Sequence, residues 1–92
     1  MFQHEVGGVA QSIVIWFDGR SAPYIRERRW HPTQSLEEHP EGAVTLRMEV
    51  PGLNEVKRWV LFYGAGARVL GPPELVVMVR SELAGMNELY KF

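Results

Sequence analysis

Residues 11–19, QSIVIWFDG, restrict the possible folds more than any other part of the chain. Their β-branched and aromatic side chains follow one another without alternating polar residues, so an extended chain here would be apolar on both faces. A strand of this kind is typical of the centre of a sheet that is covered on both sides. The chain therefore needs cover for each face of this strand, because water is a poor neighbour for a large apolar patch.

The segments that follow predict a short helix and then a hairpin. Ser21 suits a helix N-cap, and we expect the helix to run from about Ala22 to Trp30. Pro32 should stop it, because the residue before a proline is pushed out of the α-helical region. Residues 33–50 predict two strands joined by the turn HPEG. The first strand is Glu-rich, as suits a sheet edge, and the second alternates strictly between apolar and polar residues.

Two longer helices are predicted in the second half of the chain, with a short strand between them. The segment 51–64 has an apolar stripe at helical spacing, formed by Leu53, Val56, Val60 and Tyr63. Gly64 suits the position after the helix end. The segment 67–73, ARVLGPP, is a strand stopped by two prolines. The last helix, 73–92, has a second stripe, formed by Leu75, Val79, Leu83, Met86 and Tyr90.

This order, β-α-β-β-α-β-α, predicts an α+β domain. Its first six elements follow the ferredoxin-like pattern, with an additional C-terminal helix. In that fold the first and third strands are central and both helices cover one face of the sheet. We expect a single domain over residues 11–92, preceded by a linker over residues 1–10, where a pair of glycines interrupts any periodicity.

The second face of the sheet is then short of cover. Either Ile13, Ile15 and Phe17 or Val14 and Trp16 should point to it. We expect the last helix to cover at least part of this face, with a missing part of the parent chain or a second copy as the other options. The residues predicted to form an oligomer or interdomain surface are Trp16, Val76, Val77 and Met78.

Composition excludes several classes of site. The chain has no cysteine, which rules out disulfides, zinc–thiolate sites and a cysteine nucleophile. Its net charge of −1 argues against binding nucleic acid through bulk charge. No apolar run approaches the roughly 20 residues that a membrane span needs, so we expect no membrane partner.

The residues that could carry catalysis are few and scattered. His4, His31 and His39 do not pair at metal-ligand spacing, and His39 is expected to be solvated in its turn. Glu37 and Glu38 are adjacent on a strand, so they point to opposite faces and cannot act as a pair. We therefore expect no catalytic residue, no metal site and no cofactor, and we do not expect an enzyme.

The segment YIRERRWHP gathers cations beside aromatic residues. Its candidate binding residues are Arg26, Arg28, Arg29, Trp30 and His31. One interpretation is a solvated helix face on which Trp30 packs as a lid and the arginine stems lie over it. The other is a site that holds an anion or a partner, because guanidinium groups suit phosphate and carboxylate.

Two blocks of the sequence resemble a known family. PYIRERRWHPTQ (23–34), the block 42–75 that begins GAVTLRMEVPG, and the helix after it resemble the C-terminal extension (WCX) domain of WYL-domain transcriptional regulators. The resemblance spans about residues 11–90. It implies a ferredoxin-like fold, a cytoplasmic regulatory role, and a part in dimer contacts and in the response to an effector.

In that family the parent proteins are bacterial regulators with an N-terminal winged helix-turn-helix and a central WYL domain. Neither domain is present in this sequence, so the resemblance implies that DNA is bound only through the missing parts. The alternative is a stand-alone ferredoxin-like module that binds a small ligand, or a minor enzyme.

Overall fold

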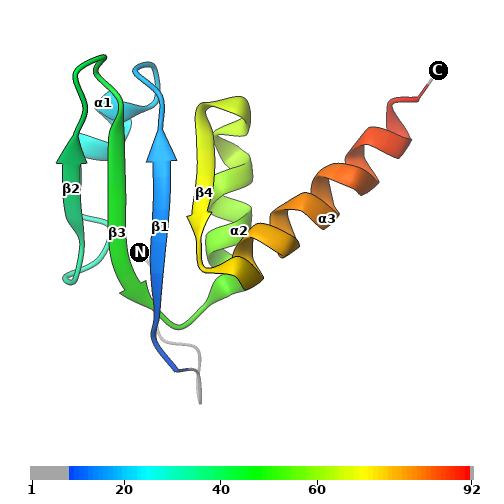
Figure 1. Cartoon of the computed structure of the whole chain (residues 1–92), viewed down its shortest axis with the longest axis horizontal. Coiled ribbons are helices and arrows are strands. Elements are labelled where there is room, and N and C mark those ends of the chain that lie inside the picture. Colours follow the sequence, from blue (N-terminus) through cyan, green and yellow to red (C-terminus); the bar gives the residue numbers. More distant parts are fainter. Residues whose placement is uncertain (1–8, 92) are drawn as a thin grey trace.

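The structure, a computed structural model, describes residues 9–91, and Figure 1 shows its arrangement. Most of the predicted linker, residues 1–8, lies outside the described residues. The elements in chain order are β1 (Gln11–Phe17), α1 (Ala22–Arg26), β2 (Ser35–Glu38), β3 (Val44–Val50), α2 (Leu53–Phe62), the 3₁₀ turn η1 (Gly64–Gly66), β4 (Ala67–Gly71) and α3 (Pro73–Leu89). Each predicted helix and strand is therefore present in the predicted order.

The four strands form one antiparallel sheet in the order β2-β3-β1-β4. The α+β class is confirmed, and so is the central position of the first and third strands. β1 pairs with β3 along its whole length, from Gln11 opposite Val50 to Phe17 opposite Val44. A register shift between Val14 and Ile15 interrupts the pairing of β1 with β4.

The hydrophobic core lies between one face of the sheet and the helices α1 and α2 (Figure 1). The β1 side chains on this face are Ile13, Ile15 and Phe17, all fully buried. The other main members from the sheet and the helices are Val44, Leu46, Met48, Val50, Ala22, Ile25, Val56, Trp59 and Val60. This face has the helical cover that the sequence predicts.

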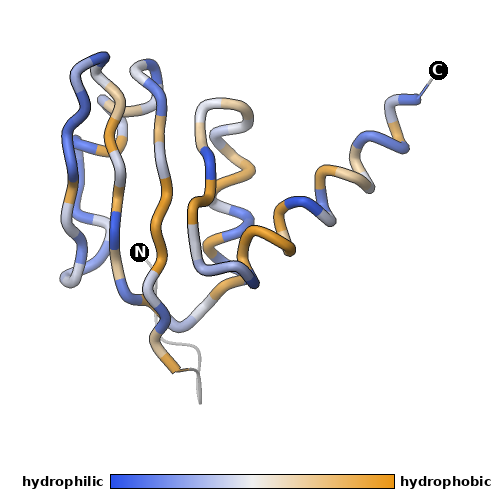
Figure 2. The backbone as a smooth tube through the Cα atoms, in the orientation of Figure 1, coloured by the Kyte–Doolittle hydropathy of each residue, from blue (hydrophilic) through white to orange (hydrophobic). Residues whose placement is uncertain are grey.

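The helices of residues 9–91 leave the opposite face of the sheet open. Val14 and Trp16 alternate with the core residues of β1 and remain half-buried. Trp16 lies opposite Thr45 of β3 and Arg68 of β4, and directly paired residues of an antiparallel sheet point to the same face. The tube in Figure 2 shows that the apolar stretch of β1 runs through the middle of the sheet.

The prediction that the last helix covers part of this open face is wrong. Helix α3 packs on β4 and α2 and then leaves the body of the domain, as Figure 1 shows. Only Pro72 separates Gly71, the end of the edge strand β4, from the first residue of α3. This connection is too short to carry the chain back across the sheet, so the helix continues outward from the edge.

The predicted extent of the first helix is also wrong, because α1 ends at Arg26 instead of Trp30. In a longer helix the carbonyl of Ile25 would accept the N–H of Arg29. Here it accepts the indole N–H of Trp30 instead, at 3.0 Å. Trp30 is only 5% exposed, so the chain leaves the helix in order to bury this side chain. The backbone N–H groups of Trp30 and His31 then donate to the Gln34 side-chain oxygen.

Candidate functional site

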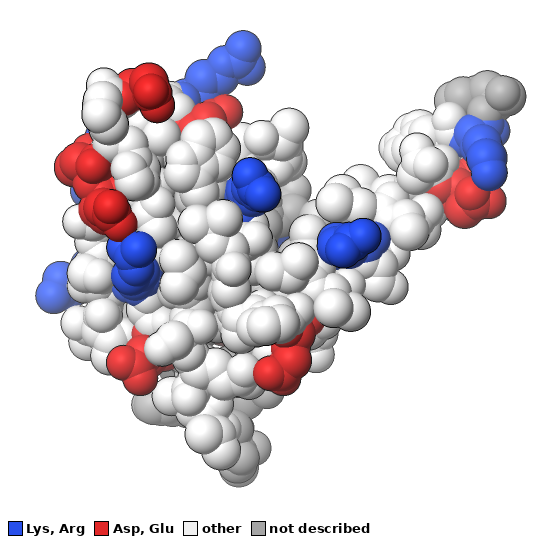
Figure 3. Space-filling model, in the orientation of Figure 1, with Lys and Arg blue, Asp and Glu red and all other residues white. Residues whose placement is uncertain are grey.

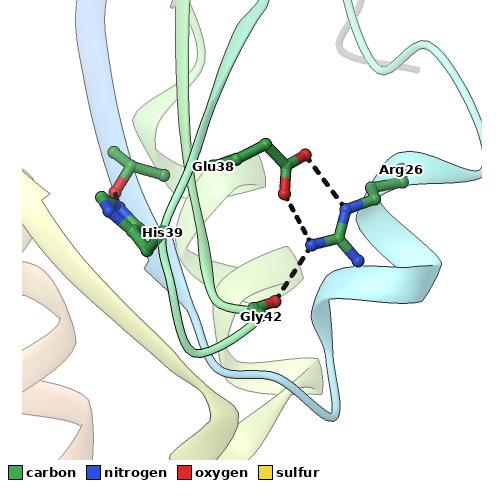
Figure 4. Close-up of polar contacts among 5 residues, drawn as sticks. Arg26, Glu38, His39 and Gly42 are labelled. Atoms are coloured by element: carbon green, nitrogen blue, oxygen red, sulfur yellow. Dashed lines mark hydrogen bonds and ion pairs between the residues drawn. The ribbon is translucent and has the colours of Figure 1, made fainter.

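The structure separates the five candidate binding residues of the segment 24–32. Arg26 lies on α1 and its guanidinium faces the hairpin formed by β2 and β3 (Figure 4). It donates from Nε to Glu38 Oε2 at 3.1 Å and from Nη2 to Glu38 Oε1 at 2.7 Å. A third bond, from Nη2 to the carbonyl of Gly42, measures 3.0 Å. Arg26 therefore links α1 to the hairpin through hydrogen bonds from its Nε and Nη2.

The charges of this pair are mutually stabilising. The hydrogen bonds from Arg26 lower the pKa of Glu38 below its ordinary value, and those to Glu38 raise the pKa of Arg26. On the other face of the same strand Glu37 pairs with Arg47 at 2.7 Å, which lowers the pKa of Glu37. The expectation that the two adjacent glutamates point to opposite faces is confirmed.

Two histidines take part in local contacts. His31 Nδ1 lies 2.7 Å from Thr33 Oγ1, and the hydroxyl of Thr33 accepts the N–H of Glu49 at 2.9 Å. His39, which the sequence predicts to be solvated, is half-buried with Nε2 2.7 Å from Thr45 Oγ1. Both contacts hold loop residues against the sheet, and His39 points away from the Arg26 pair in Figure 4.

Arg28 and Trp30 lie together in a groove of about 610 Å³ between the α1–β2 connection and helix α2. The aromatic residues of the groove are Trp30, Trp59, Phe62 and Tyr63, and its polar residues are Arg28, Asn54, Glu55 and Arg58. Arg29 is exposed and His31 half-buried, and neither lines the groove. Of the five candidates, the structure therefore brings together two, and joins them to residues of α2.

The aromatic rings of the groove touch one another. The ring centroids of Trp30 and Trp59 are 4.8 Å apart, and Tyr63 meets Trp59 edge-on at 5.5 Å. Phe62 meets Tyr63 edge-on at 5.3 Å. The tryptophans are almost buried and form the floor, whereas Phe62 is 82% exposed and forms the rim. Burial also raises the pKa of the Tyr63 phenol above its ordinary value.

Sequence reasoning missed the α2 side of the groove. Glu55, Arg58, Trp59 and Phe62 follow the spacing i, i+3, i+4, i+7, which places them on one helix face. This row lies beside the apolar stripe of α2, of which Val56 and Val60 are buried and Leu53 and Tyr63 pack against the core. Because the row mixes charged and aromatic residues, it does not form an apolar stripe. Its helical spacing could nevertheless have shown that these residues share one face of the helix.

The predicted oligomer or interdomain residues are partly accessible. Val77 is 64% exposed, and Trp16, Val76 and Met78 are half-buried. A larger apolar surface lies further along α3, where every residue from 81 to 91 is exposed. Its large apolar members are Leu83, Met86, Leu89 and Tyr90. Figure 3 views the open side of the sheet, where uncharged atoms predominate and charged groups gather toward the β2 edge on the left.

Residues 9–91 contain neither a cluster of metal-ligating side chains nor a membrane-spanning helix. No group of three histidine, aspartate or glutamate side chains there is arranged to hold a metal ion. No helix in the same part of the chain has the length and apolar character needed to cross a bilayer.

Comparison with known families identifies one match. The family model described as the WCX domain matches residues 10–86. Comparison with curated protein sequences finds no match. The matched segment includes the whole sheet, helices α1 and α2, the groove beside α2, and most of α3.

Proposed function

Because the chain belongs to the WCX domain family, we propose that it is the C-terminal regulatory and self-association domain of a WYL-type bacterial transcriptional regulator. The WCX domain is a C-terminal domain associated with WYL regulators, which supports the regulatory role. The strand order β2-β3-β1-β4, with α1 and α2 on one face, supports the assignment of a ferredoxin-like arrangement.

The observation that supports self-association is the free part of α3, that is, residues 81–89. Beyond Val79, which packs against the core, an ion pair of 3.2 Å between Lys57 and Glu82 joins the helix to α2. Residues 81–91 are all exposed and include Leu83, Met86 and Tyr90 of the predicted apolar stripe. Burying one large apolar side chain contributes about 1.5–3 kcal/mol, so this surface favours association.

The occupant of that surface is a second copy of the chain. A helix without tertiary packing is only marginally stable in water, so the free part of α3 needs a partner to stay ordered. The open sheet face offers Val14, Trp16 and the half-exposed Leu70, and no helix within residues 9–91 covers it. Each copy thus presents both an apolar helix and an apolar sheet face, which suits reciprocal contact around a two-fold axis.

The chain does not bind promoter DNA by itself in this proposal. Its net charge of −1 gives no bulk attraction to phosphate, and Arg26, Arg47 and Lys57 lie in ion pairs with glutamates. DNA contact belongs to the helix-turn-helix of the parent regulator, and the parent WYL domain is the second partner. The domain is cytoplasmic, as its DNA-bound parent must be, and it is not an enzyme.

Sedimentation velocity tests the self-association. The chain should form dimers as its concentration rises, and the variant Leu83→Gln/Met86→Gln/Tyr90→Gln should stay monomeric. Glutamine is a good helix former, so the helix itself is retained. The matched control is Tyr24→Gln/Phe62→Gln, which changes two exposed aromatic residues away from α3 and should dimerise like the unchanged chain. A chain that stays monomeric throughout, or a control that also loses the dimer, contradicts the proposal.

A mobility-shift assay with duplex DNA tests the second part of the proposal. The chain alone should bind no more tightly than proteins do without specificity, whose dissociation constants are about 10⁻⁴–10⁻⁶ M at physiological salt. Nanomolar binding by the chain alone would contradict it.

A further inference from the structure

We propose that the groove between the α1–β2 connection and α2 binds a small planar aromatic molecule that carries a carboxylate or a phosphate group. This goes beyond the proposed assembly role, which does not depend on the groove. The groove measures about 610 Å³, within the range of roughly 300–1,000 Å³ typical of small-molecule sites.

The aromatic residues that line the groove indicate an aromatic ring in the ligand. Phe62 is 82% exposed, although its neighbours Trp59 and Tyr63 are wholly or partly buried. A ring inserted beside Phe62 would contact that side chain, the phenol ring of Tyr63 and the tryptophan floor. Aromatic groups attract one another in edge-on or offset geometry beyond their area of burial, and the edge-on contacts at 5.3 and 5.5 Å already show this geometry in the groove.

The negative group of the ligand is indicated by two guanidinium groups. Arg28 reaches the groove from the α1–β2 connection and lies over the Trp30 ring, with 5.1 Å between its Cζ and the ring centroid. Arg58 reaches it from α2. Within residues 9–91, Arg26 and Arg47 are in ion pairs, whereas Arg28 and Arg58 are in none. Their planar sets of donors suit a carboxylate or phosphate.

The remaining polar groups narrow the ligand class. Glu55 also lines the groove, so two positive charges and one negative charge face the ligand. A ligand with a hydrogen-bond donor, such as a ring amino group, would satisfy the Glu55 carboxylate, and the Asn54 amide can either donate or accept. A strand of nucleic acid fits less well, because it needs an extended positive groove and this one has two cations opposed by a carboxylate.

Nuclear magnetic resonance of the whole chain tests the proposal with a built-in control. The sequence has three tryptophans, so their indole N–H signals report on separate places. Trp30 and Trp59 line the groove, and Trp16 lies on the open face of the sheet. A ligand in the groove should shift the signals of Trp30 and Trp59 saturably and leave that of Trp16 in place.

Two series of probes test whether binding needs both the ring and the negative group, and whether that group is a carboxylate or a phosphate. Anthranilate is compared with aniline, which lacks the carboxylate, and with acetate, which lacks the ring. Adenosine monophosphate is compared with adenosine and with inorganic phosphate. We expect anthranilate, adenosine monophosphate or both to bind, and each incomplete probe to bind at least about tenfold more weakly. Aniline and adenosine lack the charged hydrogen-bond partner, whereas acetate and inorganic phosphate lack the ring surface that the groove would bury. The series that binds shows whether the site takes a carboxylate or a phosphate.

Variants locate the binding. Arg58→Ala removes charged hydrogen-bond donors and Phe62→Ala removes ring contact, so each should weaken binding of the probe about tenfold or more. The matched controls Arg68→Ala and Leu70→Ala change exposed residues of β4 outside the groove and should leave the affinity unchanged. All four side chains are exposed, so the fold should survive each change.

Three outcomes would overturn the proposal: no saturable shift with either aromatic anion, an equal shift of Trp16, or equal losses in Arg58→Ala and Arg68→Ala. The sedimentation of the unliganded chain is unaffected by any of these results, so failure here is distinct from failure of the proposed assembly.

Discussion

Helices α2 and α3 have similar sequence patterns and different surroundings. Both carry an apolar stripe at helical spacing, and both begin near the same end of the sheet (Figure 1). On α2 the residues Val56, Trp59 and Val60 are buried, whereas on α3 only Leu75 is. From Leu83 onward the α3 stripe faces solvent. A periodic stripe thus predicts an amphipathic helix, but it does not say whether the cover comes from the same copy.

The difference between the two helices follows from how each is connected. Helix α2 follows the central strand β3 and returns along the sheet, so its stripe meets the core residues of β1 and β3. Helix α3 follows the edge strand β4 after one residue and continues outward. The apolar residues of its free part are therefore suited to another molecule, which is the basis of the proposed self-association.

The largest contrast is expected from truncating one apolar side chain on each helix. Trp59→Ala should destabilise the fold by about 3–5 kcal/mol, because Trp59 is 6% exposed and contacts Phe17, Trp30 and Tyr63. Leu83→Ala should change the stability of the monomer by less than about 0.5 kcal/mol. Urea unfolding at low protein concentration measures both. Similar losses for the two variants would mean that α3 is covered within one copy.

Replacing Gly66 or Gly85 with alanine should change the stability of the fold in opposite directions. A Cβ at Gly66 would collide with the Ser21 hydroxyl oxygen and lie 3.2 Å from Asp18 Oδ1, so Gly66→Ala should cost about 1–3 kcal/mol. A Cβ at Gly85, on α3, would meet nothing within 4 Å. Gly85→Ala should therefore stabilise the chain by up to about 1 kcal/mol through helix propensity. Thermal unfolding of both variants gives the comparison, and a destabilised Gly85→Ala would indicate close contacts around α3.

The smallest expected effect concerns Arg26, at the end of α1, and Arg29, in the connection that follows it. Arg26→Ala removes the ion pair with Glu38, whereas Arg29→Ala removes an exposed side chain that has no ion pair within residues 9–91. Arg26→Ala should lower the unfolding temperature slightly at neutral pH, and Arg29→Ala should leave it unchanged. Exposed ion pairs contribute little, so the difference is small.

The pH dependence of that difference identifies its origin. The folded-state pKa of Glu38 is lowered by Arg26, so the stabilisation is present above the ordinary carboxyl value of 4.5 and is lost as the pH falls through the lowered value. The unfolding temperatures of Arg26→Ala and the unchanged chain should therefore differ at neutral pH and converge in acid. A gap that persists in acid would point to packing of the Arg26 stem instead.

Much of the fold could be predicted from the sequence because local patterns determine it. The unbroken apolar run of β1, the alternation of β3 and the stripe of α2 each specify an element and a buried face. The end of α1 could not be predicted, because it depends on Trp30 reaching the Ile25 carbonyl. That contact is a tertiary interaction, and it decides whether the helix continues to Trp30 or ends at Arg26, since the local sequence allows both.

The candidate site was only half predictable for the same reason. Arg28 and Trp30 were identified from their clustering, but Arg58 and Phe62 join them only through the packing of α2 beside the α1–β2 connection. Arg26 has the same chemistry as Arg28, and its pairing with Glu38 depends on where the hairpin folds back. The direction of α3 likewise depends on the geometry of its junction with β4, which periodicity does not encode.

Hydrogen exchange of the backbone amides, measured at several protein concentrations, tests the central claim most directly. If α3 is the surface for a second copy, amides of residues 83–89 should exchange rapidly in dilute solution and become protected as the concentration rises. Amides of α2 should be protected at every concentration, because its stripe is covered within one copy. If the two helices show the same protection at all concentrations, the free part of α3 is not a surface for a second copy, and the account is wrong.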